Sequence, residues 1–278
     1  MLILDFDGTV TDAEREGAPF RDGYLEDLAI LCGQPRDTIN DLAAQAERAV
    51  HDDPDNHGWV YGGHIVAPAT VDPYLRMMPV ARAIFDHFGV FADDADRSRL
   101  LDGILYKYNY QKTLVAFRDG AFEMLSALVD TPSWVVTNSH TEPVQAKIRT
   151  LESERGMLDW WLPRVRGRAR KYIIDDGFDA IPPTLTVPGL SRPVLLRRRC
   201  YFEVIEALLA EAGQRWDDLW VLGDIFELDL AMPLAMGANV ALVVSDFTPR
   251  YEVDFVDQHP RGQLVTDLTV IPALTGAA

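Results

Sequence analysis

The sequence predicts an α/β fold in which a parallel sheet is covered by helices on both faces. Short apolar segments alternate along the chain with longer segments whose apolar residues recur at helical spacing. Parallel strands need such crossover helices, so the alternation is typical of a sheet of this kind. The strand candidates are an apolar run that begins at Leu2 and residues 133–137, 219–222 and 239–244, with residues 163–167 as a further short strand after residues 133–137.

A helical insertion interrupts this alternation directly after the first strand. Apolar residues recur at helical spacing in residues 24–31, 38–50, 73–88 and 93–110. Residues 12–21 show no such spacing, and we interpret them as a polar linker. The α/β pattern returns near residue 116. We therefore expect an α/β core of residues 1–12 and 116–278, and an inserted, mainly α-helical domain of residues 13–115.

Two segments depart from this simple pattern. Residues 51–70 hold Pro or Gly at five positions and lack periodicity, so we predict a long loop there. Trp59, Tyr61 and His64 in this loop are candidates for contact with a substrate. Residues 172–197 combine strand-forming residues with Gly and Pro, which predicts a small β excursion that includes a hairpin.

Charge and composition exclude several classes of protein. The 43 Asp and Glu residues outnumber the 26 Lys and Arg residues, and the resulting net charge of −17 disfavours nucleic acid and anionic membranes as partners. No apolar run reaches the length that spans a membrane. Cys32 and Cys200 lie far apart in the chain, so we expect no disulfide framework. Because the first strand begins at Leu2, we also expect no signal peptide. We expect a cytoplasmic monomer or homodimer.

The first strand ends in two carboxylates and a glycine. Asp5 and Asp7 are two residues apart, so in extended backbone their side chains leave in similar directions and repel each other. A divalent cation bound through oxygen relieves that repulsion, and Mg²⁺ takes only one or two protein carboxylates. Gly8 permits a tight turn and the close approach of a ligand. The pattern therefore predicts a magnesium site at this strand end.

The start of the chain closely resembles the first signature of the haloacid dehalogenase-like (HAD) hydrolases, most of which are Mg²⁺-dependent phosphatases. Its residues are Asp5-Phe6-Asp7-Gly8-Thr9-Val10-Thr11. The resemblance implies a Rossmann-like core and a helical cap that closes over the active site and selects the substrate. It implies that Asp5 is the nucleophile and forms an aspartyl-phosphate. Asp7 would protonate the leaving oxygen, deprotonate the attacking water and bind Mg²⁺ through its carbonyl oxygen.

Two further strand ends are similar to signatures of this family. Thr137 ends an apolar strand, as the Thr or Ser of the second signature does, and we expect it to bind phosphate together with Gly8 and Asn138. The acidic fourth signature, GDxxxxD, is matched by Gly223-Asp224-Ile225-Phe226-Glu227-Leu228-Asp229. Asp224 and Asp229 are therefore expected to bind Mg²⁺ alongside Asp5 and Asp7.

Each of these matches has a plain structural alternative. Thr137 could form a turn at the end of its strand through its own hydroxyl. Asp224 could cap the following helix, with Glu227 three residues later completing a capping box.

The resemblance also implies a cation that neutralises the nucleophile and the phosphate. Lys171 follows the third strand of the core and is our choice. By sequence order the cation could equally be Arg197, Arg198 or Arg199, and we include Arg199 among the residues expected to bind phosphate.

We therefore expect a Mg²⁺-dependent phosphatase that acts on a small phosphorylated metabolite. A phosphomutase built on the same core, or a catalytically silent binding or regulatory module, remains an alternative. Dehalogenation is disfavoured because Asp7 is acidic. A zinc site at His51, His57 and His64 is a further alternative, although their spacing matches no tetrahedral zinc pattern.

Overall fold

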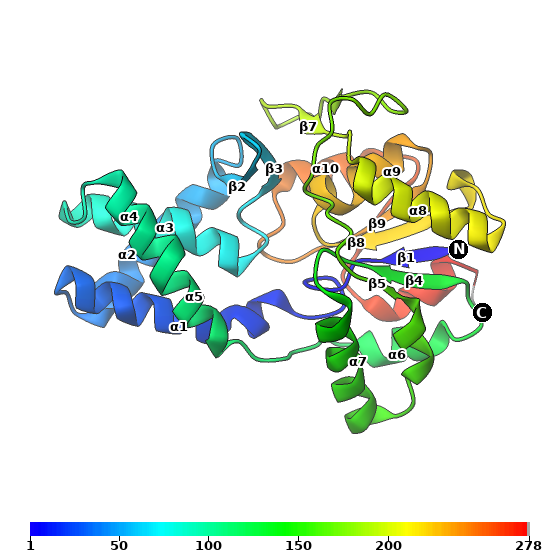
Figure 1. Ribbon diagram of the computed structural model, residues 1–278, viewed down its shortest axis with the longest axis horizontal. Helices are drawn as coiled ribbons and strands as arrows, with labels where there is room; N and C mark the ends of the chain where they lie inside the picture. Colours follow the sequence, from blue (N-terminus) through cyan, green and yellow to red (C-terminus); the bar gives the residue numbers. More distant parts are fainter. Residues whose placement is uncertain (277–278) are drawn as a thin grey trace. The chain divides into compact units, whose positions relative to one another are not determined.

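The computed structural model describes residues 1–276 and divides the chain into two compact units (Figure 1). The α/β unit contains Met1–Asp12, Val60–Ala67 and the chain from Phe117 onward. The helical unit contains Ala13–Trp59 and Pro68–Ala116.

A six-stranded parallel sheet forms the centre of the α/β unit. Its strands are β1 (Leu2–Leu4), β4 (Ser133–Val136), β5 (Val165–Arg166), β8 (Trp220–Gly223), β9 (Asn239–Val243) and β10 (Gly262–Val265). They are arranged in the order β10-β9-β8-β1-β4-β5, and every pairing is parallel. The predicted α/β fold is confirmed, and the first strand lies between the strands that precede the second and fourth signatures.

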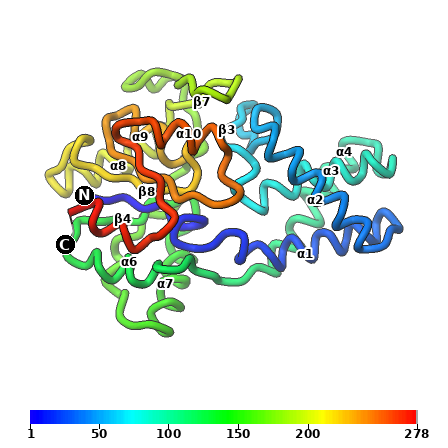
Figure 2. Tube along the Cα trace, turned by 180° about the vertical axis from the view of Figure 1, so that it is seen from behind, coloured from blue at the N-terminus to red at the C-terminus, as the bar shows by residue number. Residues whose placement is uncertain are grey.

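Helices cover both faces of this sheet, as Figures 1 and 2 show. They are α6 (Ala121–Ala127), α7 (Thr141–Arg155), α8 (Arg199–Ala212), α9 (Ala231–Ala235), α10 (Arg250–Gln258) and α11 (Ile271–Leu274). Alternate residues of β1 point to opposite faces: Ile3 packs into a core with α8, α9 and α10, whereas Leu2 and Leu4 pack into a core with α6, α7 and α11. Two buried cores therefore hold the sheet from either side.

The predicted β excursion is present in the α/β unit. β6 (Thr184–Leu185) and β7 (Val194–Leu195) pair antiparallel, whereas the strand-forming residues 172–174 form no strand. Phe178 and Val187 from this excursion are buried in the core that contains α8, so the excursion is an integral part of the unit.

The helical unit is built from α1 (Ala13–Cys32), α2 (Arg36–Asp52), α3 (Pro73–Phe88), α4 (Asp94–Leu100) and α5 (Lys107–Asn109). The polar linker predicted for residues 12–21 is wrong, because α1 begins at Ala13. Gly17, Phe20 and Tyr24 give this helix a buried face at the expected spacing. The first turns bury Glu16 and Gly17 instead of large apolar side chains, so they lack the apolar spacing that predicts a helix. A side chain at Gly17 would meet Pro73 of α3 at 2.5 Å, so the glycine lets the two helices pack closely.

The long loop predicted for residues 51–70 is also wrong. α2 continues to Asp52, and a hairpin of β2 (Gly58–Tyr61) and β3 (His64–Pro68) follows. Gly62 and Gly63 form its turn with positive φ values of 59° and 83°. A two-residue turn of this hand favours glycine at both positions. The glycines that suggested an irregular loop are the residues that close the hairpin.

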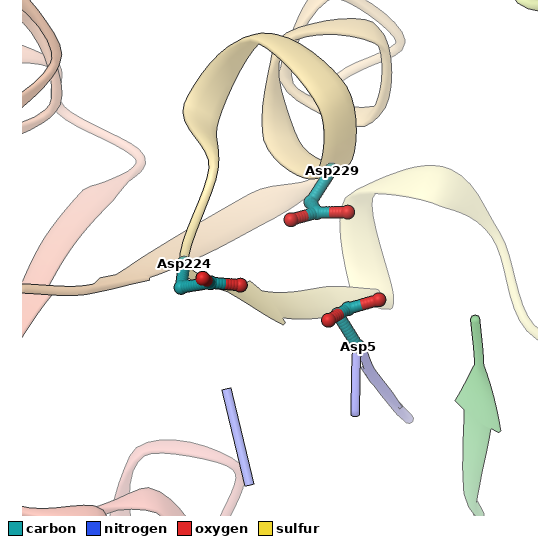
Figure 3. Close-up of side chains that lie close together, drawn as sticks. All are labelled: Asp5, Asp224 and Asp229. Atoms are coloured by element: carbon teal, nitrogen blue, oxygen red, sulfur yellow. The ribbon is translucent and has the colours of Figure 1, made fainter. Parts of the chain in front are cut away.

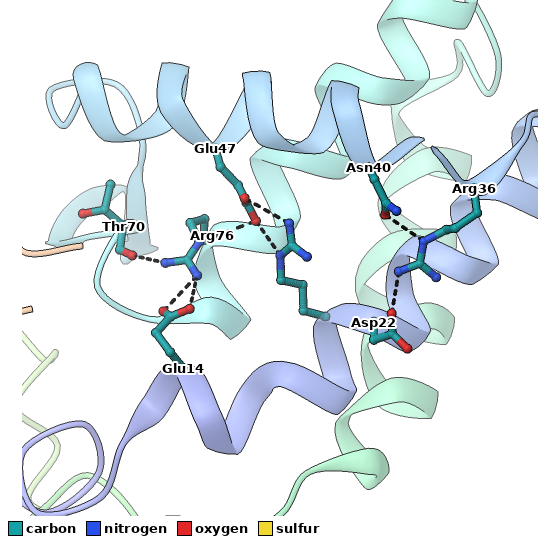
Figure 4. A network of polar contacts seen from close by, with 8 residues as sticks. Glu14, Asp22, Arg36, Asn40, Glu47, Thr70 and Arg76 are labelled. Atoms are coloured by element: carbon teal, nitrogen blue, oxygen red, sulfur yellow. Dashed lines mark hydrogen bonds and ion pairs between the residues drawn. The ribbon is translucent and has the colours of Figure 1, made fainter. Parts of the chain in front are cut away.

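Ion pairs and hydrogen bonds link the first three helices of the helical unit (Figure 4). The buried guanidinium of Arg76 on α3 binds Glu14 on α1 at 2.7 Å and the carbonyl oxygen of Thr70. Arg21 on α1 pairs with Glu47 on α2 at 2.7 Å. Because a buried charge needs partners, this network favours one arrangement of the three helices.

No helix within residues 1–276 is both long enough and apolar enough to cross a membrane.

Candidate active site

The candidate site lies at the carboxyl end of the parallel sheet. β1 is hydrogen-bonded to β4 on one side and to β8 on the other. The residues that follow these three strands, including Asp5, Thr137 and Asp224, therefore meet at one edge of the sheet. Ligands of open α/β sheets bind at this edge.

Three buried aspartates form the centre of the site. One carboxylate oxygen from each of Asp5, Asp224 and Asp229 lies within 4.8 Å of the others, and the three side chains point toward one another (Figure 3). Burial raises the pKa of Asp5 to about 7, although the charge of Lys171 opposes the shift. Burial and then the charges of Asp5 and Asp229 raise the pKa of Asp224 well above its ordinary value. Without a bound cation, the cluster therefore resists full ionisation.

Lys171 is the cation that the fold brings to these aspartates. Its Nζ atom lies 2.6 Å from Oδ1 of Asp5 and 2.8 Å from Oδ1 of Asp229, and its side chain is fully buried. Burial alone would lower the pKa of Lys171, but Asp229 and Asp5 raise it above its ordinary value, so the ammonium stays charged. The Oδ1 atom of Asn138 accepts a hydrogen bond from the backbone N–H of Lys171 at 2.7 Å. This bond holds the backbone from which the lysine side chain extends.

Two of the three arginines considered as alternative cations have other partners. Arg197 donates to the carbonyl oxygen of Asp176, and Arg199 pairs with Asp175 at 2.8 Å. Within residues 1–276, neither forms a hydrogen bond or ion pair with Asp5. The geometry therefore gives no support to a phosphate-binding role for Arg199.

Arg198, the third arginine, forms a hydrogen bond with the backbone of Lys171. Its fully buried guanidinium donates to the carbonyl oxygen of Lys171 and, at 2.9 Å, to that of Val66 in β3. The rings of Tyr61 and Tyr172 also meet edge-on, with centroids 4.8 Å apart. The segment Val60–Ala67 thus contacts the loop that carries the catalytic candidate Lys171.

Two glycines let the acidic segments approach each other. Gly8 has a φ of +86°, and a Cβ atom there would lie 2.2 Å from Oδ2 of Asp224. A Cβ atom at Gly223 would lie 2.5 Å from the Cβ atom of Asp229. Any side chain at either position would displace one of the clustered carboxylates.

Thr9 is a site residue to which the sequence analysis gave no role. Its hydroxyl lies 2.9 Å from Oδ1 of Asp224 and 3.3 Å from Oδ2 of Asp5, and it is buried. A single hydroxyl hydrogen serves these two acceptors, so Thr9 links the first and fourth signatures. Its place after Gly8 in the first signature was the signal that pointed to it.

Thr137 lies where the second signature predicts, at the end of β4, and is buried. Its hydroxyl oxygen accepts the backbone N–H of Ser139 at 3.1 Å, which is the turn considered as the structural alternative. The hydroxyl hydrogen can still be donated to a ligand. The turn and the phosphate-binding role are therefore compatible.

Asp7 lies apart from the three clustered aspartates and is partly exposed. Ser139 donates its hydroxyl to Oδ2 of Asp7 at 2.6 Å, and Nζ of Lys147 lies 2.7 Å from Oδ1. Neither partner was predicted from the sequence. Ser139 and Lys147 lie eight residues apart, one in a loop and the other on a helix, and this spacing matches no recognisable pattern.

A second buried network anchors the acidic segment after β8. Glu227 is fully buried and receives two hydrogen bonds from Arg192, at 2.6 and 2.7 Å, and another from the hydroxyl of Tyr251. The carboxylate of Glu252 accepts the backbone N–H of Phe226 at 3.1 Å. Glu227 therefore forms no capping box with Asp224, and the β excursion reaches the acidic segment through Arg192.

The residues of the cluster fit a magnesium ion. Three carboxylates and one ammonium leave a formal charge of −2, which a divalent cation would balance. The donors are all oxygens, as Mg²⁺ prefers, and no histidine or cysteine is among them. Burial, with a further contribution from the charges of neighbouring aspartates, raises the pKa values of Asp5 and Asp224, and a bound cation would favour the ionised form of both. His51, His57 and His64 are not part of this cluster.

Comparison with known proteins places the fold. Neither the models of known protein families nor the curated protein sequences contain a match to this chain. Among solved structures, the chain is similar to a predicted phosphoglycolate phosphatase from Haemophilus somnus, with a TM-score of 0.54 and 13% identity over 99% of this chain and 97% of that one.

Two further solved structures show the same likeness at 16% identity. One is a conserved haloacid dehalogenase-like protein of unknown function from Agrobacterium tumefaciens, with a TM-score of 0.53. The other is a putative HAD-hydrolase from Bacillus subtilis bound to magnesium, with a TM-score of 0.52. In both cases 99% of this chain and 97% of the other chain are covered. The chain therefore has the fold of the HAD hydrolases and phosphatases.

Proposed function

We propose that the protein is a Mg²⁺-dependent phosphatase that hydrolyses a small phosphorylated metabolite through an aspartyl-phosphate on Asp5. The observation that carries the proposal is the 2.6 Å contact between Lys171 and Asp5 inside a cluster of three buried aspartates. A carboxylate that must attack an anionic phosphate needs such a cation beside it. The likeness to a predicted phosphatase and to a magnesium-bound hydrolase supports the proposal.

In the first step, a carboxylate oxygen of Asp5 attacks the phosphorus atom of the substrate. The new O–P bond forms as the bond to the leaving oxygen breaks, and Asp7 gives its proton to that oxygen. Lys171 reduces the repulsion between Asp5 and the phosphate. The hydroxyl of Thr137 donates to a phosphoryl oxygen.

In the second step, a water molecule attacks the phosphorus atom of the aspartyl-phosphate. Asp7, now ionised, accepts a proton from this water. The bond between Asp5 and phosphorus breaks, which releases inorganic phosphate and restores the carboxylate. Splitting the displacement into two steps lets one pair of carboxylates serve both.

The side chains of Asp5, Asp224 and Asp229, with the backbone carbonyl of Asp7, would hold the magnesium ion. Bound there, Mg²⁺ would neutralise charge on the phosphate as it is transferred. We assign contact with the substrate to Trp59, Tyr61 and His64, three residues that the sequence singles out. Trp59 belongs to the helical unit, whereas Tyr61 and His64 lie in the segment Val60–Ala67 of the α/β unit.

Phosphate release from para-nitrophenyl phosphate tests the proposal. Wild-type protein is assayed with Mg²⁺ and with EDTA, beside Asp5→Asn and a control, Asp257→Asn, which removes an exposed carboxylate on α10. We expect turnover that requires Mg²⁺, is lost in Asp5→Asn and is kept in Asp257→Asn. Turnover that survives in Asp5→Asn would contradict the mechanism. A folded protein that binds Mg²⁺ but releases no phosphate from a broad panel of metabolites would instead favour a mutase or a silent module.

A further inference from the structure

Asp7 is held on both of its oxygens by one segment of the chain. Ser139 lies in the loop after β4 and donates to Oδ2 at 2.6 Å. Lys147 lies on α7, the helix that follows this loop, and its Nζ atom is 2.7 Å from Oδ1 of Asp7. A carboxylate bound on both oxygens cannot rotate freely about its side-chain bonds. Asp7 is therefore oriented although it is partly exposed.

Lys147 is itself held in place by the packing of α7. Its neighbours Val144 and Ile148 are buried in the core that also contains Leu2 and Leu4 of β1. The side-chain amide of Gln145 donates to the carbonyl oxygen of Leu162 at 2.7 Å. The lysine thus extends from a fixed point of the helix, which makes its reach to Asp7 reproducible.

Stability alone does not account for this contact. A partly exposed ion pair contributes little to the free energy of folding, because solvent screens it and two long side chains must be ordered. Asp7 and Lys147 keep 35% and 22% of their side-chain surfaces exposed. Asp7 lies between Phe6 and Gly8 in the first signature. We therefore relate the ion pair to the chemistry of the site.

We propose that Lys147 is a positioning residue that, with Ser139, aims the carboxyl group of Asp7 at the leaving oxygen of the substrate. The inference rests on the proposed phosphatase function, in which Asp7 is the general acid. A general acid works only when its proton lies within hydrogen-bond reach of the oxygen that receives it. Without Lys147, the carboxyl group of Asp7 can rotate away from the leaving oxygen, although Asp7 itself is still present.

The dependence of the rate on the leaving group tests this role. β-Glycerophosphate has a poor leaving group that needs a proton, whereas dinitrophenyl phosphate has one that departs without it. We expect Lys147→Met to lower kcat/KM for β-glycerophosphate by about 10- to 100-fold, a part of what a general acid contributes, and that for dinitrophenyl phosphate by less than about 3-fold. The value of kcat/KM is used because it reports the step that forms the aspartyl-phosphate.

Four further variants make the result specific. Arg149→Met removes an exposed cation from the same helix and should leave both substrates unaffected. Lys147→Arg keeps a cation in reach of Asp7 and should recover most of the loss. Asp7→Asn should show the same selectivity for leaving group, and adding Lys147→Met to it should cause no further selective loss, because both changes remove one function.

The outcomes separate this inference from the proposed function. An equal loss on both substrates, or no loss on either, in Lys147→Met would overturn the positioning role while wild-type turnover upheld the phosphatase. Absence of any Mg²⁺-dependent turnover in wild-type protein would overturn both.

Discussion

The Nζ atom of Lys171 lies 2.6 Å from Oδ1 of Asp5, although 166 residues separate the two in sequence. The same ammonium lies 2.8 Å from Asp229, so one buried cation is shared by the carboxylates of the first and fourth signatures. Removing either partner would leave a buried charge uncompensated. The predictions below follow from this shared charge and from the residues that hold it.

Replacing Lys171 should impair both catalysis and folding. Lys171→Met leaves Asp5 and Asp229 buried without their cation, so we expect kcat/KM to fall about 100- to 1,000-fold, as for other groups that stabilise transition-state charge. The free energy of unfolding of the metal-free protein should fall by about 3 kcal/mol or more. Steady-state kinetics and denaturant titration in EDTA measure the two effects.

Arg170→Met is the matched control for this prediction. Arg170 is the residue before Lys171 and is exposed, and its replacement by Met also removes one positive charge. A comparable loss in both variants would mean that general electrostatics, rather than the contact with Asp5, carries the effect.

Magnesium should stabilise the folded protein through the aspartate cluster. We expect Mg²⁺ to raise the thermal midpoint of wild-type protein because it binds the folded state and balances three buried carboxylates. Asp224→Asn should lose most of that gain. Its metal-free midpoint should exceed that of wild type, since one of the mutually repelling charges is gone.

Differential scanning fluorimetry in EDTA and in excess Mg²⁺ gives both values. Asp257→Asn, which alters an exposed carboxylate on α10, should respond to Mg²⁺ as wild type does. An undiminished gain in Asp224→Asn would exclude this aspartate as a ligand.

The stability of the metal-free protein should fall as pH rises toward neutrality. Burial raises the pKa of Asp5 to about 7, so the folded state keeps a proton that the unfolded chain releases near pH 4. Stability from this group is fully present below the unfolded pKa and is lost as pH rises through the folded pKa. The thermal midpoint in EDTA should therefore decline between about pH 4 and pH 7 more steeply in wild type than in Asp5→Asn.

Magnesium should reverse this trend, because it binds the ionised carboxylates. The increase in midpoint caused by Mg²⁺ should thus grow from about pH 5 to pH 8 in wild type. Parallel slopes for wild type and Asp5→Asn in EDTA would refute the assignment of the titration to Asp5.

The β excursion should support the binding of magnesium through Arg192. Arg192→Ala leaves the fully buried Glu227 without its guanidinium partner, two residues before Asp229. We expect weaker Mg²⁺ binding, seen as a higher Mg²⁺ concentration for half-maximal thermal stabilisation, with a smaller change in kcat at saturating Mg²⁺. Adding Glu227→Gln should restore part of the loss, because the unpaired buried charge is then absent.

Much of the fold and the centre of the site could be predicted from local patterns. The strands of the sheet are short apolar runs, and Asp5, Asp224 and Thr137 follow them at positions that a signature marks. Lys171 could only be chosen among several cations. The contact with Asp5 depends on a loop in which Arg168 and Arg170 both adopt positive φ, and residue spacing does not reveal that conformation.

The two errors in the helical insertion have separate physical causes. The first turns of α1 lack apolar spacing, and the glycines and prolines of residues 51–70 were taken as signs of irregular backbone. In α1, Gly17 permits close helix packing, and at Gly62 and Gly63 the chain makes a hairpin turn. Contacts such as Lys147 with Asp7 were missed for a different reason. They join residues 140 positions apart that no local pattern connects.

Trapping of the phosphorylated enzyme tests the central claim most directly. Protein turning over a phosphate ester with Mg²⁺ is quenched in acid, digested and analysed by mass spectrometry. We predict a phosphoryl group on the carboxylate of Asp5, and none in Asp5→Asn treated in the same way. Steady turnover with no phosphoryl group at Asp5, or with one at another residue, would contradict the account.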